Sequence, residues 1–310
     1  MWDPADPSPA PAWAALIDAA TVVVNLAGAN PGARRWNDSA LAEIRDSRLE
    51  AIAALGRAVR AAKSPPRAFL QSSAVGVYGH GGTVPRSDDP HNPIGEAAEA
   101  AAANAASPLP AAAARGSRFR MDTCRAIEAA CVAAVAAPGA GKPPVVVALR
   151  FGHVLAAREG LLPWLALAAA AGTTRIGSGT QSVPWVHVDD AAAAVAHVIN
   201  DVDNIATLFP AASPIAVNVV VPTPSAQTDF LGALRGVPTS PARLLPAAWA
   251  VAVPAAVFAV AVGPGSSVVL DSCHATADVL KRIGFHWRYV APVDAVRSLA
   301  CQDGLPPSKQ

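Results

Sequence analysis

The sequence predicts an α/β protein built on a parallel, doubly wound sheet. Short apolar runs, typical of strands covered on both faces, recur along the chain, and segments with helical periodicity separate one run from the next. This alternation predicts right-handed crossovers that place helices on both faces of the sheet. Ligands of such sheets bind beyond the carboxyl ends of the strands, so polar residues at those ends are the candidate functional residues.

The first predicted strand is the run TVVVNLAG at residues 21–28, which ends in small residues. A helix is predicted over residues 37–63, because its large aliphatic residues recur with a 3.6-residue period. Polar residues at 37–39 can cap its start, and two prolines at 65–66 end it. Arg48 lies on the apolar stripe of this helix, where a guanidinium needs a partner or must face a cleft.

The later elements follow the same pattern. Further strands are predicted at 68–74, 144–150 and 215–221, and further helices at 118–137, 161–171 and 191–200. Residues 85–117 consist largely of Ala, Pro, Asn and Ser with few large apolar residues, and residues 138–143 are similar, which predicts insertions that form solvated loops, with lids as the alternative.

The uncharged segment 244–263 has nearly the length of a membrane span. It is interrupted by Pro246 and Pro254 and lacks flanking basic clusters, which favours a buried helix that begins at a proline over a spanning helix. The N-terminus, MWDPADP, has neither the basic flank nor the apolar core of a secretory signal.

Charge and cysteine content limit the class of protein. Lys and Arg total 24 against 23 Asp and Glu, so the net charge of +1 offers no electrostatic basis for holding nucleic acid. Four widely spaced cysteines suit structural thiols in a reducing compartment. We therefore expect a soluble protein of the cytoplasm or of an organelle matrix, the mitochondrial matrix included, without a membrane span.

Two strand ends carry most of the candidate chemistry. Ser73, in the segment SSAVGVYG at 72–79, has a hydroxyl that can hydrogen-bond a carbonyl undergoing reduction, and Tyr78 is the one phenol nearby. A tight turn and a core-edge ring with a satisfied hydroxyl are the structural alternatives. Arg150 ends a buried strand, where it can face a cofactor or a substrate anion.

His187, Asp189 and Asp190 suggest a metal site at first sight. Strand alternation directs only His187 and Asp189 to one face, which leaves too few ligands. A helix N-cap is the better interpretation of the Asp pair, and we predict no metal.

Seven segments, taken together and in this order, resemble one family over nearly the whole chain. They are NLAG (25–28), RRW (34–36), IRDSRLE (44–50), SSAVGVYG (72–79), LRFGHVL (149–155), IGSGTQSVPWVHVDD (176–190) and VLKRIGFHWRY (279–289). The combination is similar to the "epimerase family protein" branch of the atypical short-chain dehydrogenases/reductases. The last segment resembles that branch's small C-terminal domain of unknown function.

The resemblance implies a Rossmann-type domain over 1–235, a small C-terminal α+β domain over 236–310, and NADP as cofactor. Ser73 and Tyr78 are the candidate catalytic residues from the chemistry of their side chains. The cofactor-binding positions it implies are Asn25, Leu26, Ala27, Gly28, Ser72, Arg150 and Gly152. Its implied substrate positions are Arg35, Trp36, Arg48, Gln181 and Trp185. The substrate itself is left open, a small carbonyl or sugar-type compound being expected.

The sequence departs from the family pattern in two places. The family's domain opens with a strand and a glycine-rich turn that holds the pyrophosphate, and no such turn is present in these 310 residues. We therefore expect an incomplete sheet and, if the chain is the whole protein, little NADP binding.

Ordinary short-chain dehydrogenases also use a Tyr four residues before a Lys, and the matching positions here are Arg120 and Cys124. We interpret Cys124 as a buried structural thiol rather than a nucleophile, and Arg120 and Arg125 as solvated residues.

Two functions remain open at this point. One is an NADP-dependent oxidoreductase or epimerase-like enzyme. The other is a catalytically inactive structural or assembly subunit, whose exposed sheet edge pairs with a partner chain or with a second copy.

Overall fold

The computed structural model describes residues 12–18, 20–81, 85–89, 109–136, 142–210, 213–236 and 250–303. Its centre is a parallel sheet of four strands in the order β1-β2-β4-β9. The strands are β1 (Val22–Asn25), β2 (Ala68–Ala74), β4 (Val145–Phe151) and β9 (Ile215–Val219). The predicted α/β fold class is confirmed, since each predicted strand is present within a few residues of its expected bounds.

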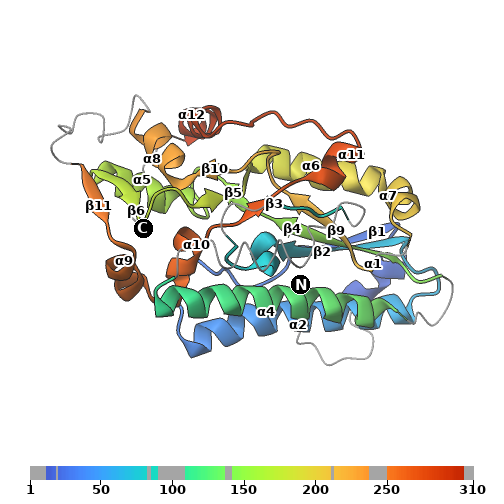
Figure 1. Cartoon of the computed structure of the whole chain (residues 1–310). Helices are drawn as coiled ribbons and strands as arrows, with labels where there is room; N and C mark the ends of the chain where they lie inside the picture. Colours follow the sequence, from blue (N-terminus) through green and yellow to red (C-terminus); the bar gives the residue numbers. More distant parts are fainter. Residues whose placement is uncertain are drawn as a thin grey trace.

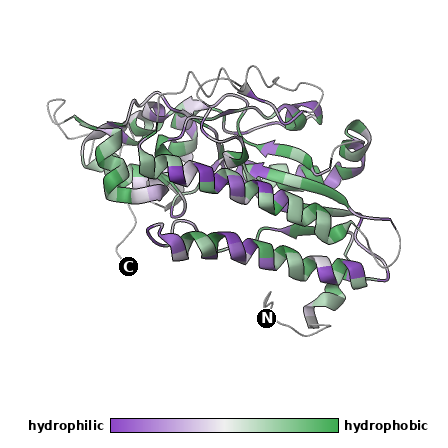
Figure 2. Cartoon of the chain, turned by 60° about the horizontal axis from the view of Figure 1, so that its bottom comes forward, coloured by the Kyte–Doolittle hydropathy of each residue, from purple (hydrophilic) through white to green (hydrophobic). Residues whose placement is uncertain are grey.

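Helices cover both faces of this sheet (Figure 1). On one face lie α2 (Asp38–Ala61) and α4 (Ala111–Val135), which pack on Val23, Phe69 and Val146 through a shared apolar cluster. On the other lie α6 (Val188–Asn200) and α7 (Val202–Leu208). Figure 2 shows hydrophilic and hydrophobic residues alternating along α2 and α4, as expected for helices with one buried face.

The predicted cap of the first long helix is present at Asn37. Its side-chain oxygen accepts the backbone N–H of Ala40 at 2.9 Å, which satisfies a donor that the first turn of α2 otherwise leaves free.

A second lobe consists of short strand pairs and helices. The pairs are β5 (His153–Leu155) with β8 (Trp185–His187), β6 (Thr173–Ile176) with β11 (Val251–Val253), β7 (Ser182–Val183) with β10 (Ser225–Ala226), and β3 (Pro85–Arg86) with β12 (His274–Ala275). Its helices are α5 (Leu162–Ala170), α8 (Gln227–Gly236), α9 (Ala255–Val262), α10 (Ser267–Leu270) and α12 (Pro292–Asp303), whereas α11 (Asp278–Arg282) packs on β9 of the parallel sheet. The remaining short elements are η1 (Ala12–Ala14), α1 (Ala15–Asp18), η2 (Val75–Tyr78) and η5 (Gly263–Ser266).

Part of the predicted insertion at 85–117 is regular structure. α4 begins at Ala111, because an alanine run with small side chains forms a helix that packs closely on η5. An added Cβ at Gly116 would lie 1.9 Å from the carbonyl oxygen of Pro264. Residues 85–86 form a short strand, and the loop interpretation of 90–108 and 137–141 falls outside the described residues.

The apolar segment at 244–263 differs from its predicted burial. α9 does begin directly after Pro254, but Val257 and Val260 are 60% and 78% exposed, and only Ala259 is buried. The prediction of a buried helix is therefore wrong, because α9 lies on the outside of the second lobe (Figure 1). No helix in the described part of the chain is both long and apolar enough to cross a membrane. Residues 244–249 lie outside the description.

The residues after 250 pack against both lobes. Cys273, Leu280 and Phe285 join the cluster under the parallel sheet, while Leu270, Ala295 and Leu299 join the core of the second lobe. The division into domains at 235 and 236 stays a prediction.

Candidate functional site

A buried network of polar side chains lies at the carboxyl ends of β2 and β4. Ser73 and Arg150 are paired neighbours on these strands, and both contact Glu128 of α4. The Ser73 hydroxyl donates to Glu128 Oε1 at 2.7 Å, while Arg150 forms a two-pronged ion pair to the same carboxylate at 2.9 and 2.8 Å. The carboxylate is thus enclosed with a cation and a hydroxyl, which is the arrangement a buried charge requires.

Tyr78 extends this network to the last strand of the sheet. Its hydroxyl donates to Asn218 Oδ1 at 3.0 Å and accepts from Arg150 at 3.0 Å. Asn218 in turn gives its backbone N–H to Asp88, whose other oxygen accepts the N–H groups at the start of α11. One chain of polar contacts therefore joins β2, α4, β4, η2 and β9.

The network shifts the pKa of its members. Burial raises the pKa of Tyr78 to about 12, against the opposing effect of Arg150. Burial also opposes the charge on Arg150, but the hydrogen bonds and charge of Glu128 outweigh it and raise the pKa of Arg150 above its ordinary value. Burial raises the pKa of Asp88 to about 6. At neutral pH Tyr78 keeps its proton and Arg150 its charge.

The predicted catalytic hydroxyls thus both have partners in this structure. Ser73 is 7% exposed and bonded to Glu128, and the Tyr78 hydroxyl is bonded on both sides. The catalytic roles of Ser73 and Tyr78 stay a prediction.

The predicted cofactor residues of β1 form a tight turn. Asn25 is buried, gives its amide to Gln71 at 2.8 Å and accepts the N–H of Ala27, while Leu26 is 60% exposed. Gly28 lies against Arg48, since an added Cβ would be 2.7 Å from the Arg48 guanidinium carbon.

The remaining predicted cofactor residues lie on the neighbouring strands. Ser72 is half-buried in β2, and Gly152 passes within contact of the Pro184 carbonyl, so that only a glycine fits.

Arg48 has backbone partners. Its guanidinium donates to the carbonyl oxygens of Ala29 at 3.1 Å and Ile44 at 2.6 Å, and it forms no ion pair among the described residues. Burial lowers its pKa. Arg48 thus supports the turn after β1 while keeping a charge that protein carboxylates do not neutralise.

The predicted substrate residues are not gathered at one place. Arg35 donates to the Val260 carbonyl of α9, which connects the turn after β1 to the second lobe. Trp36 is buried against Phe119 of α4 and packs with Val268 of α10. Gln181 and Trp185 are buried in that lobe. Gln181 donates to the carbonyls of Ile176 and Val269, and Trp185 donates to Ser225.

Arg120 and Cys124, at the positions of the usual Tyr and Lys, have different environments. Cys124 is buried near the end of β2, and burial raises its pKa. Arg120 is ion-paired with the buried Asp271, so the expectation of a solvated Arg120 is wrong. The cause is tertiary, because Asp271 comes from a segment 151 residues away that packs on α4. Arg125 is exposed as expected.

The prediction that the Asp pair caps the helix is wrong, because His187 caps α6 instead. Its Nδ1 accepts the backbone N–H of Asp189 at 3.1 Å at the start of α6. The cap is His187 itself, whereas Asp190 instead accepts two backbone N–H groups from Arg288 and Tyr289. Within the described ranges, no group of three His, Cys, Asp or Glu side chains is placed to hold a metal ion.

Sequence reasoning missed Glu128, Asn218 and Asp271. Glu128 lies on the inner face of α4 three to four residues from Cys124 and Cys131, and a carboxylate on an otherwise small, apolar stripe is the signal that could have found it. Asn218 interrupts the apolar run of β9 in the same way. Asp271 does not interrupt an apolar stripe or run, so no sequence pattern indicates it.

Comparison with known proteins agrees with this architecture. Residues 125–212 match the model of the NAD dependent epimerase/dehydratase family. The epimerase family protein SDR39U1 of Bos taurus is 31% identical over 179 residues, and an epimerase family protein of Mycobacterium leprae is 30% identical over 182 residues. Over the matched residues the chain is similar to epimerase family proteins of the short-chain dehydrogenase/reductase type.

The chain spans about half the length of these relatives. The alignments cover 57% of the chain and 51% of the bovine or 48% of the mycobacterial protein. A chloroplastic homologue from Arabidopsis thaliana is 24% identical over 293 residues, covering 93% of the chain and 70% of the homologue.

Solved structures share the fold. Human SDR39U1, crystallised with NADPH, has a TM-score of 0.65 at 23% identity, covering 90% of this chain and 81% of that one. UDP-glucuronic acid 4-epimerase from Bacillus cereus, in complex with UDP-glucuronic acid and NAD, has a TM-score of 0.61 at 14% identity, covering 97% and 80%. The Rossmann-like fold is therefore established.

Proposed function

We propose that this chain carries the nicotinamide half of an NADP site, in an oxidoreductase that acts on a small carbonyl or sugar-type compound. The observation that supports this most is the pairing of β1 with β2. Because these parallel strands are neighbours, the turn at 25–28 and η2 lie side by side at one edge of the sheet, where dinucleotides bind in doubly wound folds. The human relative crystallised with NADPH supports the choice of cofactor.

The residues present suit such a ligand. Ala27 and Gly28 are small and not buried, so a ligand can approach the backbone closely. Arg48 brings a positive charge whose protein partners are carbonyl oxygens, and a phosphate oxygen of the cofactor would complement it. These residues would hold the cofactor, which supplies a hydride when bound.

Tyr78 and Ser73 are the proposed catalytic residues. Tyr78 is protonated at neutral pH, because burial raises its pKa to about 12, and this is the state that a proton donor needs. Arg150, 3.0 Å from the Tyr78 oxygen, would stabilise the phenolate left after proton transfer. Ser73 would orient the substrate carbonyl once its hydroxyl turns from Glu128, and Glu128 then keeps Arg150 in place.

The test combines binding and turnover on the full chain. Titration with NADPH and with reduced nicotinamide mononucleotide, followed by nicotinamide fluorescence, is expected to show weak binding of both with similar affinity. The contacts above are with the nicotinamide half, and these 310 residues hold no glycine-rich turn for the pyrophosphate. Oxidation of NADPH by a panel of aldehydes and ketones then measures turnover. In Y78F, turnover should fall by about 100-fold or more while both affinities stay unchanged. Failure of both nucleotides to bind the unmodified chain would contradict the proposal.

A second candidate is supported by the position of β1. It is the outer strand of the four-stranded sheet in the described structure, and such an edge offers unpaired backbone groups to another chain. On this view the chain is an assembly subunit without turnover. Turnover that depends on Tyr78 would exclude it.

A further inference from the structure

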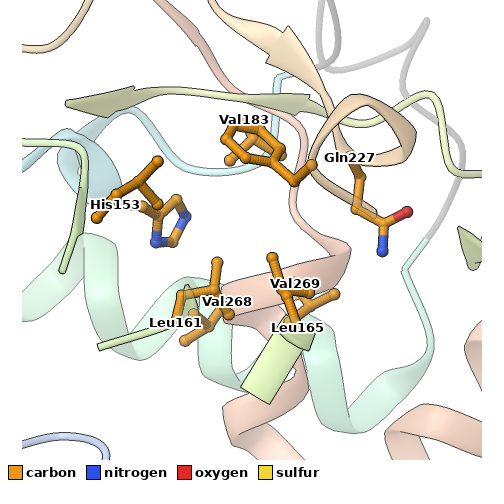
Figure 3. A pocket seen from close by; sticks show the side chains of 9 residues that line it. His153, Leu161, Leu165, Val183, Gln227, Val268 and Val269 are labelled. Atoms are coloured by element: carbon orange, nitrogen blue, oxygen red, sulfur yellow. The ribbon is translucent and has the colours of Figure 1, made fainter. Parts of the chain in front are cut away.

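The recess between α5, α8 and α10 is too small for a substrate. Figure 3 shows His153 on one side of it, Gln227 on the other, and Leu165 and Val269 below. Its enclosed part has room for about one water molecule, and most of its lining is aliphatic. A substrate would therefore bind elsewhere, and the polar side chains around Tyr78 are the ones placed to act on it.

Asn218 is a member of the buried polar network to which the proposed function gives no role. It lies on β9 between Val217 and Val219, and all three residues are fully buried. A carboxamide in such a place lowers the stability of the fold unless its polar groups are hydrogen-bonded. The contacts of Asn218 therefore show what this residue does on an otherwise apolar strand.

The nitrogen of the Asn218 carboxamide is held by two carbonyl oxygens. Nδ2 donates to the Thr276 carbonyl at 2.8 Å and, more weakly, to the Arg86 carbonyl at 3.4 Å. Both carbonyls come from the ribbon that β3 and β12 form, where the Thr276 N–H donates to the Arg86 carbonyl at 3.0 Å. Turning the carboxamide over would bring its oxygen against two other acceptors, so the oxygen is directed to the opposite side.

The Tyr78 hydroxyl lies on that opposite side. It donates to Asn218 Oδ1 at 3.0 Å and accepts from Arg150 at 3.0 Å. Arg150 and Asn218 are cross-strand neighbours on β4 and β9, so their side chains leave the same face of the sheet. The phenol oxygen is therefore held between a donor on one strand and an acceptor on the next, with its proton directed to β9.

We propose that Asn218 is a positioning residue that sets the direction of the Tyr78 O–H bond, and that the β3–β12 ribbon in turn sets the orientation of Asn218. The inference rests on the proposed function, in which Tyr78 gives its proton to the substrate. When the bound cofactor reduces the substrate's carbonyl carbon, the Tyr78 O–H bond breaks, a new O–H bond forms on the substrate oxygen, and a phenolate remains beside Arg150. Until then Asn218 accepts this proton and Arg150 holds the oxygen.

The direction of the O–H bond can be measured without cofactor or turnover. The chain has two tyrosines, so Tyr78 is the only phenol in Y289F. The intensity ratio of the tyrosine Raman doublet distinguishes a phenol that donates a hydrogen bond from one that only accepts. Y289F should give the ratio of a phenol that does both, and Y289F/N218L should shift this ratio to that of a phenol that only accepts.

Two further variants separate positioning from stability. V217A is the matched control, because Val217 is equally buried in the apolar core of the same strand. In the Y289F background it should lower the melting temperature and leave the Raman ratio unchanged. Y78F removes only a hydroxyl and keeps the shape of the site. It should shift the ¹³C resonance of the Asn218 side-chain carbonyl, which N218L identifies by its loss, whereas Y289F should leave that resonance in place.

Turnover of the full chain then tests the link to the reaction. N218L should lower kcat by about tenfold, as the loss of one hydrogen bond predicts, and should leave KM for NADPH unchanged. A Raman ratio that N218L does not change, an equal shift in V217A, or full kcat in N218L would each overturn the proposal. Absence of turnover in the unmodified chain would instead contradict the proposed function, and the Raman ratio would still decide whether Asn218 directs the hydroxyl.

Discussion

The Tyr78 hydroxyl donates a hydrogen bond to Asn218 and accepts one from Arg150. Arg150 alone would favour the phenolate, but burial of the phenol has the larger effect and raises the pKa. The cation therefore stabilises a phenolate only when a substrate takes the proton. Tyr78 is therefore protonated in the resting protein, in contrast to a tyrosine that is already ionised before substrate binds.

The titration of Tyr78 can be measured directly, because the chain has only two tyrosines. In Y289F the single remaining phenol is Tyr78, and its ionisation, followed by ultraviolet absorbance, should have a midpoint near 12. The sign follows from burial, which penalises the charged form. In Y289F/R150M the midpoint should move higher still, since the favourable cation is lost. A midpoint of about 10, the value of a free phenol, would show that Tyr78 is exposed.

Arg48 permits a second prediction at this scale. R48A should weaken NADPH binding by about tenfold, because a phosphate loses its cation and the turn after β1 loses the two carbonyl bonds that hold it. R45A on the same helix is the control, since Arg45 is exposed and forms its ion pair with the neighbouring Asp46. A large fall in melting temperature with NADPH affinity unchanged would instead make Arg48 a structural residue.

The sequence indicated some of these residues and not others for a physical reason. Arg48 breaks an apolar stripe, so its position alone indicates a special environment. The acceptors it uses are backbone carbonyls of a turn, and no side-chain pattern reports them. Arg120 looked solvated because its partner Asp271 is distant in sequence and meets it only after the lobes pack.

At the scale of elements, regular periodicity predicted the sheet and its long helices. The strands of two or three residues, such as β3 and β7, were not predictable, because their pairing partners come from distant segments and they carry no period of their own. The start of α4 was missed for a related reason. An alanine run has no apolar periodicity, and its burial depends on close packing against η5.

The contact between α4 and η5 can be tested at Gly116. G116A should lower the free energy of unfolding by about 2 kcal/mol or more, because the new methyl group would lie 1.9 Å from the Pro264 carbonyl oxygen and the helices would have to separate. G232A on α8 is the matched control. An added Cβ there has no neighbour within 4 Å, so the better helix propensity of alanine should raise the stability by about 0.5–1 kcal/mol. Equal effects of the two substitutions in urea unfolding would refute this packing.

At the scale of the molecule, β1 is both the first part of the candidate site and the edge of the sheet. Val23 and Asn25 are buried by α2 and by neighbouring strands, but the backbone groups on the outer side of β1 have no strand beside them in the described structure. The sequence predicted such an edge from the resemblance to a family with a longer sheet. Helices normally cover both faces of a parallel sheet, but an edge strand presents unpaired backbone groups, so the edge at β1 is a candidate interface.

We therefore expect the isolated chain to self-associate through β1, or to require a partner chain there. Light scattering at rising concentration should show dimers or larger species, because an unpaired strand edge next to the exposed Leu26 favours pairing with another copy. L26K should shift the equilibrium toward monomer, since a lysine at the strand end opposes edge pairing. L167K is the control, because Leu167 is equally exposed, at 60%, but lies on α5 of the other lobe. A stable monomer at high concentration, or association lost only in L167K, would show that the edge of β1 is not the interface.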